Sequence, residues 1–181
     1  AHSLGLDSMI SAYDFEAMDI AVESGTSCLK IATANIVNIP LIRHAAQSNL
    51  PIIFDTGKST IAEIHNAVEC AIKWGKGGFM INHSPDGHPA LPEDHNLLII
   101  DTYRKIFDCP IGIADHYVGE EMLYAATALG YDLLEKPVCL DPETADVDSP
   151  WAMRLDRIGI VKKKVSECCV ARGKTFREKK Y

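Results

Sequence analysis

The sequence has no Cys-x-x-Cys pair and no apolar run near the roughly 20 residues that a membrane-spanning helix needs. Its six cysteines are scattered, which argues against a disulfide scaffold or a zinc ribbon and predicts buried, reduced thiols. An excess of basic residues is missing too, because the formal net charge is -7, so we expect neither a nucleic-acid partner nor an anionic membrane surface. The first residues lack the basic and apolar regions of a signal peptide, and we therefore expect a cytoplasmic protein.

Short apolar segments alternate with segments of helical periodicity along the whole chain. Strands are expected at residues 8–13, 28–33, 51–56, 78–83, 110–115 and 132–137. Helices are expected at residues 14–24, 39–48, 60–74, 95–107, 120–129 and 151–172. This order predicts βα units around a parallel sheet whose strands, having little polar alternation, are buried on both faces.

Turn signals support this division of the chain. Gly25, Gly75 and Gly130 follow helix ends, where a residue in the left-handed conformation is often needed. Asp14 and Ser59 precede helices and are predicted N-caps. Because no linker of low complexity divides the sequence, we predict a single domain.

Polar residues gather where the predicted strands end. They are Ser11, Lys30, Thr33, Asp55, Thr56, Asn82, His83, Asp115, His116, Glu135 and Lys136. In parallel barrels and doubly wound sheets, this edge carries the active site. Lys30 lies within an apolar strand, where an ammonium is costly unless it meets an anion, so it is predicted to contact a phosphate or carboxylate. A lysine that reaches the edge of the sheet to stay in water is the alternative.

Asp115 and His116 form the strongest pair among these residues. A histidine beside a carboxylate, directly after a buried strand, suits a divalent-metal ligand or a group that transfers a proton. A histidine with a purely structural role is the alternative.

Five motifs in order resemble the sialic acid synthase family, which includes N-acetylneuraminate, legionaminic acid and pseudaminic acid synthases. They are Leu-Lys-Ile-Ala-Thr at 29–33 with Asn-Ile-Pro-Leu at 38–41, Asp-Thr-Gly at 55–57, His-Ser-Pro-Asp-Gly-His-Pro at 83–89, Gly-Ile-Ala-Asp-His at 112–116 and Leu-Glu-Lys at 134–136. The resemblance covers about residues 4–172.

The resemblance implies a parallel (β/α) TIM-barrel-type domain over residues 1–174, followed by a basic tail at 175–181. About six βα units are present, matching the third to eighth strands of the family. The family's first two strands and its C-terminal antifreeze-like domain are expected to be absent from this chain. A homodimer is expected from the family alone.

By the same resemblance, the activity is condensation of phosphoenolpyruvate with an N-acylated hexose, such as N-acetylmannosamine, to give a sialic acid-like nonulosonic acid and phosphate. The implied catalytic residues are Lys30, Asp115 and His116, with His116 binding a Mn²⁺ or Mg²⁺ ion that polarises the sugar aldehyde. The implied substrate-binding residues are Ser11, Lys30, Thr33, Asp55, Thr56, His83, Asp86, His88, Glu135 and Asp146.

Three residues depart from the family pattern. Pro137 replaces the second metal-binding histidine and has no donor atom, so His83, Asp86 and His88 become candidate replacements. Ala114 replaces a serine. Asp55 replaces another serine, and because an acid repels phosphate unless it is protonated or paired, it is expected to orient the sugar or to bond Lys58.

These departures leave two other functions open. One is a catalytically degenerate barrel that binds a sugar or a protein. The other is an aldolase that forms a Schiff base through Lys30.

Overall fold

A six-stranded parallel sheet forms the centre of the fold. The computed structural model describes residues 1–140 and 146–175. The strands are β1 (Met9–Ser11), β2 (Cys28–Ile31), β3 (Ile52–Asp55), β4 (Phe79–His83), β5 (Ile111–Ala114) and β6 (Leu133–Glu135). They lie side by side in chain order, and every neighbouring pair is parallel. The six predicted strands are therefore confirmed, each slightly shorter than expected.

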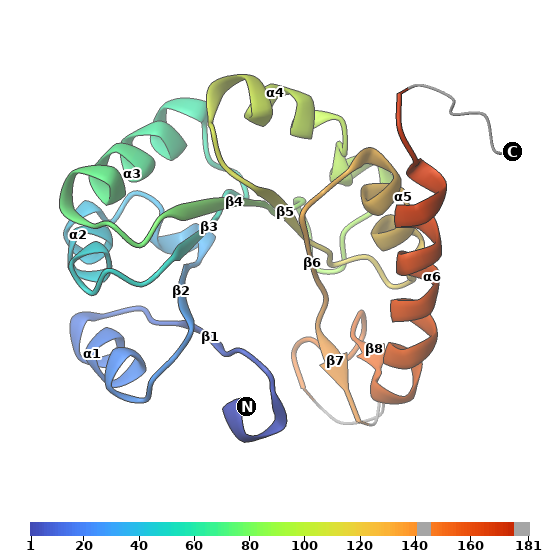
Figure 1. The fold of residues 1–181 in the computed structure, drawn as a ribbon, viewed down its shortest axis with the longest axis horizontal. Helices are drawn as coiled ribbons and strands as arrows, with labels where there is room; N and C mark the ends of the chain where they lie inside the picture. The colour runs from blue at the N-terminus through green and yellow to red at the C-terminus, as the bar shows by residue number, and fades with distance from the viewer. Residues whose placement is uncertain (141–145, 176–181) are drawn as a thin grey trace, which may run out of the picture.

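Helices follow one another around the outer side of the curved sheet (Figure 1). They are α1 (Phe15–Glu23), α2 (Ile39–Gln47), α3 (Ile61–Trp74), α4 (Ile99–Ile106), α5 (Glu121–Leu129) and α6 (Ile158–Arg172). Short 3₁₀ turns are η1 (His2–Leu4), η2 (Thr33–Asn35), η3 (Pro92–His95) and η4 (Leu155–Arg157). The strands β7 (Val138–Cys139) and β8 (Met153–Arg154) form a second, two-stranded parallel sheet.

The two faces of the large sheet differ sharply. Because side chains alternate along a strand and residues paired in register share a face, one set of residues points toward the helices. Most of that set is apolar, and its members that are at most 1% exposed include Leu29, Ile31, Ile52, Phe54, Ile81, Ile111 and Ile113. The other, inner face carries Lys30, Asp55, Asn82 and Glu135 near the carboxyl ends of the strands. The sheet thus packs an apolar core on its outer side and places charge on its inner side.

One of the two predicted N-cap residues caps its helix in the structure, and the other does not. The Asp14 carboxylate accepts the amide of Ala17 at 2.8 Å and caps α1, as predicted. The N-cap of α3 is Thr60 rather than Ser59, because the Thr60 side chain and Glu63 form a reciprocal capping box.

Two of the three glycines behave as predicted. Gly25 and Gly130 have φ of 76° and 92°, in the left-handed region. The prediction for Gly75 is wrong, because its φ is -139°, which is extended backbone. A side chain is excluded there for a different reason: an added Cβ would lie 2.3 Å from the carbonyl oxygen of Ala46.

Two predicted helices begin later than expected. The helix expected from Trp151 begins at Ile158, because Met153–Arg154 pairs with β7 and the amide of Met153 donates to the carbonyl of Pro137 at 2.8 Å. The helix expected from His95 begins at Ile99, after η3 and a left-handed Asn96 with φ of 40°.

All six cysteines are free thiols, in agreement with the sequence. Burial is confirmed only for Cys70, since Cys169 is exposed and the other four are half-buried. Within the described ranges, no helix has the length and apolar character required to cross a membrane. Of the predicted basic tail, residues 176–181 lie outside the described residues.

Candidate active site

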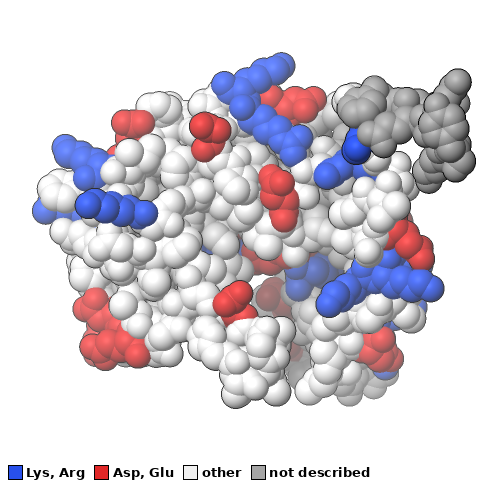
Figure 2. All heavy atoms as spheres, in the orientation of Figure 1, with Lys and Arg blue, Asp and Glu red and all other residues white. Residues whose placement is uncertain are grey.

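Four side chains on the inner face of the sheet form a closed ring, which we call the strand-end cluster: Lys30, Asp55, Asn82 and Glu135. The Lys30 ammonium lies 2.8 Å from Asp55 and 2.5 Å from Glu135. The Asn82 amide donates to the same two carboxylates, each at 2.8 Å. Strands β2, β3, β4 and β6 each contribute one member. The space-filling view shows charged atoms of both signs recessed toward the middle of the largely uncharged surface (Figure 2).

The strand-end cluster carries more negative than positive charge. Burial alone would lower the pKa of the Lys30 ammonium, but the carboxylates of Asp55 and Glu135 outweigh burial and raise it. Burial, together with the charge of Glu135, raises the pKa of Asp55 in spite of Lys30. Lys30 is therefore a charged ammonium. Asp55 does not bond Lys58 as suggested from sequence, because Lys58 pairs with Asp86 at 3.0 Å on the surface.

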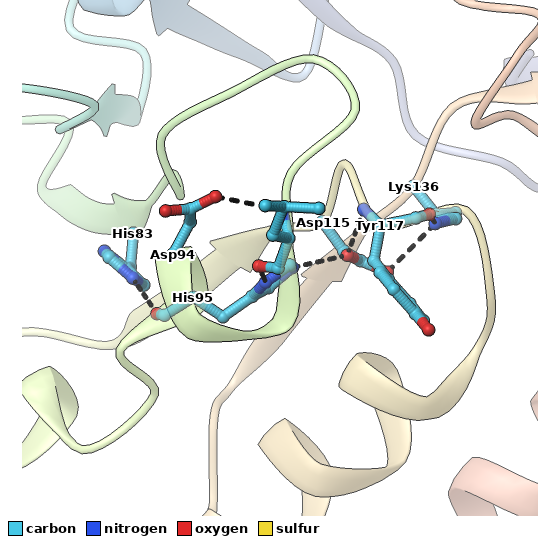
Figure 3. A network of polar contacts seen from close by, with 7 residues as sticks. His83, Asp94, His95, Asp115, Tyr117 and Lys136 are labelled. Atoms are coloured by element: carbon cyan, nitrogen blue, oxygen red, sulfur yellow. Dashed lines mark hydrogen bonds and ion pairs between the residues drawn. The ribbon is translucent and has the colours of Figure 1, made fainter.

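A second network surrounds the buried carboxylate of Asp115 (Figure 3). One carboxylate oxygen lies 3.0 Å from His95 Nε2 and accepts the amide of Tyr117 at 2.8 Å. The other oxygen lies 3.0 Å from the ammonium of Lys136, which also donates to the carbonyl of Tyr117. Burial alone would raise the pKa of Asp115, but these donors outweigh burial and lower it. Asp115, a predicted catalytic residue, is fully buried and holds the segment around His116.

His116 is half-buried, and charged members of both networks lie close enough to shift its pKa. Burial, then the neighbouring charges of His88 and Lys30, lowers the pKa of His116 to about 4. Its ring is therefore neutral at neutral pH. The rings of His88 and His116 have centroids 4.0 Å apart, and His88 also contacts Trp151. Nδ1 of His116 is buried and has no hydrogen-bond partner in the described part of the chain.

The remaining predicted residues at strand ends lie at the carboxyl ends of β1, β2 and β3. Ser11 is exposed and pairs in register with Lys30. Thr33 opens η2 and approaches Gly57 so closely that an added Cβ on Gly57 would lie 2.1 Å from a Thr33 methyl carbon. Thr56 is buried, and its amide donates to the carbonyl of Asn82 at 3.1 Å.

Other predicted residues lie apart from the strand-end cluster. Asp86 is exposed. His83 points to the helix side of the sheet, where its ring meets Tyr103 with centroids 6.2 Å apart. Asp146 is exposed, and its carbonyl accepts the amide of Ser149 at 3.3 Å. No contact among the described residues joins Asp146 to either network.

The described residues do not fit a complete metal site. No group of three or more His, Cys, Asp and Glu side chains gathers there as metal ligands do. Pro137 offers its carbonyl to Met153 and has no side-chain donor. His116 presents one free nitrogen beside His88, and this set is too small to hold a divalent ion unaided. We therefore derive no step through a metal.

Three residues that hold the site together were not predicted as site residues: Asn82, His95 and Lys136. Asn82 and Lys136 were visible as polar residues at strand ends. His95 gave no local signal, because it lies in a short 3₁₀ turn and meets Asp115 20 residues later.

The fold and the position of the polar residues define a class of fold. A curved parallel sheet with polar side chains gathered at the carboxyl ends of its strands is the arrangement of TIM-barrel-type domains. The chain belongs to the NeuB family, whose profile matches residues 1–177. The resemblance seen in the motifs and the partial barrel expected from it are thereby confirmed.

Individual relatives agree with this assignment. The N,N'-diacetyllegionaminic acid synthase of Legionella pneumophila is 28% identical over 78% of this chain and 41% of its own length. The pseudaminic acid synthase of Helicobacter pylori is 28% identical over 84% of this chain and 45% of its own. A sialic acid synthetase structure from Leptospira borgpetersenii superposes with a TM-score of 0.88 at 27% identity, covering 94% of this chain and 59% of that one. The chain thus spans less than half the length of these two curated relatives.

Proposed function

We propose that this chain forms most of the barrel of a synthase that condenses phosphoenolpyruvate with an N-acylated hexose, N-acetylmannosamine or a related sugar. The products are a nonulosonic acid and phosphate. The observation that carries the proposal is the family match over residues 1–177. In the reaction, carbon 3 of phosphoenolpyruvate bonds to the aldehyde carbon of the sugar, water adds to carbon 2, and phosphate leaves. A homodimer and a divalent ion at His116 remain predictions from the family.

Lys30 is the proposed anchor for the phosphate. It is a buried ammonium on the inner face, and two of its three N–H donors are engaged by Asp55 and Glu135, which leaves one donor for a phosphate. His116 is the proposed proton-transfer group, because its ring is neutral and close enough to Lys30 for the ammonium to lower its pKa. A neutral imidazole there can accept a proton from the attacking water or hold one near the developing alkoxide.

One alternative function is favoured by a specific observation and the other is not. A Schiff-base aldolase needs Lys30 as a neutral amine, whereas its pKa is raised by two carboxylates. The catalytically degenerate barrel is favoured by the strand-end cluster itself, because Lys30 is already neutralised by side chains of the same chain.

Phosphate release from phosphoenolpyruvate tests the proposal. The chain, and any longer protein that contains it, would be assayed with a panel of N-acylated hexoses, with manganese, magnesium or a chelator. Lys30→Met should abolish sugar-dependent release, whereas the exposed control Lys76→Met should retain it. No release with any sugar from folded protein would favour the degenerate barrel.

A further inference from the structure

His95 has an unusual set of hydrogen-bond partners. It ends η3 and is 1% exposed. Its Nδ1 lies 2.8 Å from the carbonyl oxygen of Leu91, and its Nε2 lies 3.0 Å from a carboxylate oxygen of Asp115. A carbonyl oxygen can only accept a hydrogen bond. The Asp115 carboxylate also acts as an acceptor, because the Tyr117 amide and the Lys136 ammonium both donate to it.

Both nitrogens of His95 therefore have to donate. A neutral imidazole has one N–H, so it would leave one of these two contacts without a proton. The ring satisfies both contacts only as an imidazolium, which shares the carboxylate of Asp115 with the Lys136 ammonium. Among the described residues, three further titratable groups lie near it. Lys136 lies on the far side of Asp115, His83 donates from Nε2 to the carbonyl of His95 at 2.7 Å, and the Tyr117 ring meets the His95 ring with centroids 6.1 Å apart.

The contacts of His95 hold two segments together. One segment carries His116, and the other carries His88. In the first segment, Asp115 precedes His116, and its carboxylate accepts the amide of Tyr117. In the second segment, His95 holds Leu91, and the amide of the adjacent Ala90 donates to the carbonyl of His116 at 3.0 Å. The same loop carries His88, whose ring lies against that of His116. His95 thus joins the loop before η3 to the turn after β5 (Figure 3).

We propose that His95 is a positioning residue: a buried imidazolium that donates to Leu91 and Asp115 and thereby holds the His116 ring in place for the reaction. It touches no reacting atom. Its effect on turnover rests on the proposed function, whereas its protonation and its hold on His116 do not.

Nitrogen-15 NMR of the labelled chain at neutral pH tests the charge directly. Comparison with His95→Phe assigns the His95 signals among the seven histidines. Both His95 nitrogens should resonate as protonated imidazolium nitrogens, each coupled to a hydrogen-bonded proton. A neutral ring with one unprotonated nitrogen would overturn the proposal. If the phenylalanine variant does not fold, His95→Gln provides the assignment.

Variants test the positioning role. His95→Phe keeps a ring but removes both donors, so the His116 signals should shift and kcat should fall roughly 10- to 100-fold, with KM for phosphoenolpyruvate little changed. His95→Gln retains one donor for Asp115 and should recover part of the loss. His65→Phe, at an exposed histidine on α3, is the matched control and should behave as wild type.

The outcomes separate the two proposals. Unchanged His116 signals and kcat in a folded His95→Phe protein would contradict the role of His95. If the wild-type protein shows no turnover of phosphoenolpyruvate, the proposed function fails, and the NMR measurements still decide whether His95 holds His116.

Discussion

At the scale of single residues, the ammonium of Lys30 faces two carboxylates in a mostly buried ring that the amide of Asn82 closes. A doubly charged phosphate that approaches Lys30 must overcome the repulsion of Asp55 and Glu135. Two acids near one cation thus set the affinity of this site for anions as much as the lysine does.

Removing one of these acids should strengthen anion binding. Asp55→Asn keeps the shape of the side chain and removes one negative charge within contact of Lys30, so KM for phosphoenolpyruvate should fall roughly tenfold. Steady-state phosphate release measures it. Asp156→Asn, at an exposed acid paired with Arg154, is the matched control and should leave KM unchanged. A KM for Asp55→Asn that stays the same or rises would show that Asp55 does not oppose the phosphate.

His116 should make stability depend on pH. The fold holds its ring neutral down to a pKa of about 4, whereas the unfolded chain protonates it near the ordinary value of 6.5. Between these values the unfolded state binds the extra proton, so acidification from pH 7 to pH 5 lowers the free energy of unfolding. The melting temperature of wild type should fall more over this interval than that of His116→Asn. Equal falls in both proteins would contradict the neutral state of the folded ring.

The sequence revealed some of these residues and not others, for physical reasons. A lysine in an apolar strand is conspicuous because burial of its charge is costly, and Lys30 was found in this way. Asp55 and Glu135 were also predicted as site residues, but their pairing with Lys30 was not. Asp55 lies on the adjacent strand β3, whereas Glu135 on β6 meets Lys30 only through the curvature of the sheet. His95 became important through a backbone turn that no local pattern reveals.

At the scale of elements, strands were easier to predict than helix starts. A strand is predicted from several apolar residues in a row, all of which indicate burial. A helix start depends on a single contact, in which one particular hydroxyl accepts one particular amide. Ser59 and Thr60 illustrate the difference, because either could cap α3 by sequence. Thr60 does so since Glu63 lies three residues later and its carboxylate accepts the amide of Thr60 in the reciprocal contact.

The two hydroxyls therefore predict different costs of mutation. Thr60→Ala should lower the free energy of unfolding by about 1 kcal/mol, because it removes the acceptor for the amide of Glu63. Ser59→Ala should change it by no more than about 0.5 kcal/mol, as is usual for a surface substitution. Urea unfolding of both variants measures the difference. Equal losses of unfolding free energy in the two variants would show that Ser59 also caps α3.

At the scale of the whole molecule, the sheet is parallel and in chain order but remains open. Within the described residues, β1 and β6 each pair on one side only. The alternation of strands and helices predicted this topology, because right-handed βα units place successive strands side by side. It could not predict how far the sheet curves, since curvature follows from register and twist. The strand-end cluster is evidence of that curvature, because Lys30 on β2 contacts Glu135 on β6 across the inner face.

The contact between Lys30 and Glu135 joins residues 105 apart in the chain, and it should therefore couple β2 to β6. A double-mutant cycle with Lys30→Met and Glu135→Gln should give a coupling energy of about 1–3 kcal/mol in urea unfolding, because the pair is largely removed from water. The exposed pair Lys58 and Asp86, with Lys58→Met and Asp86→Asn, should give less than about 1 kcal/mol. If the first cycle is additive within about 0.5 kcal/mol, the contact does not tie β2 to β6, and the curvature of the sheet must be held by the helices packed outside it.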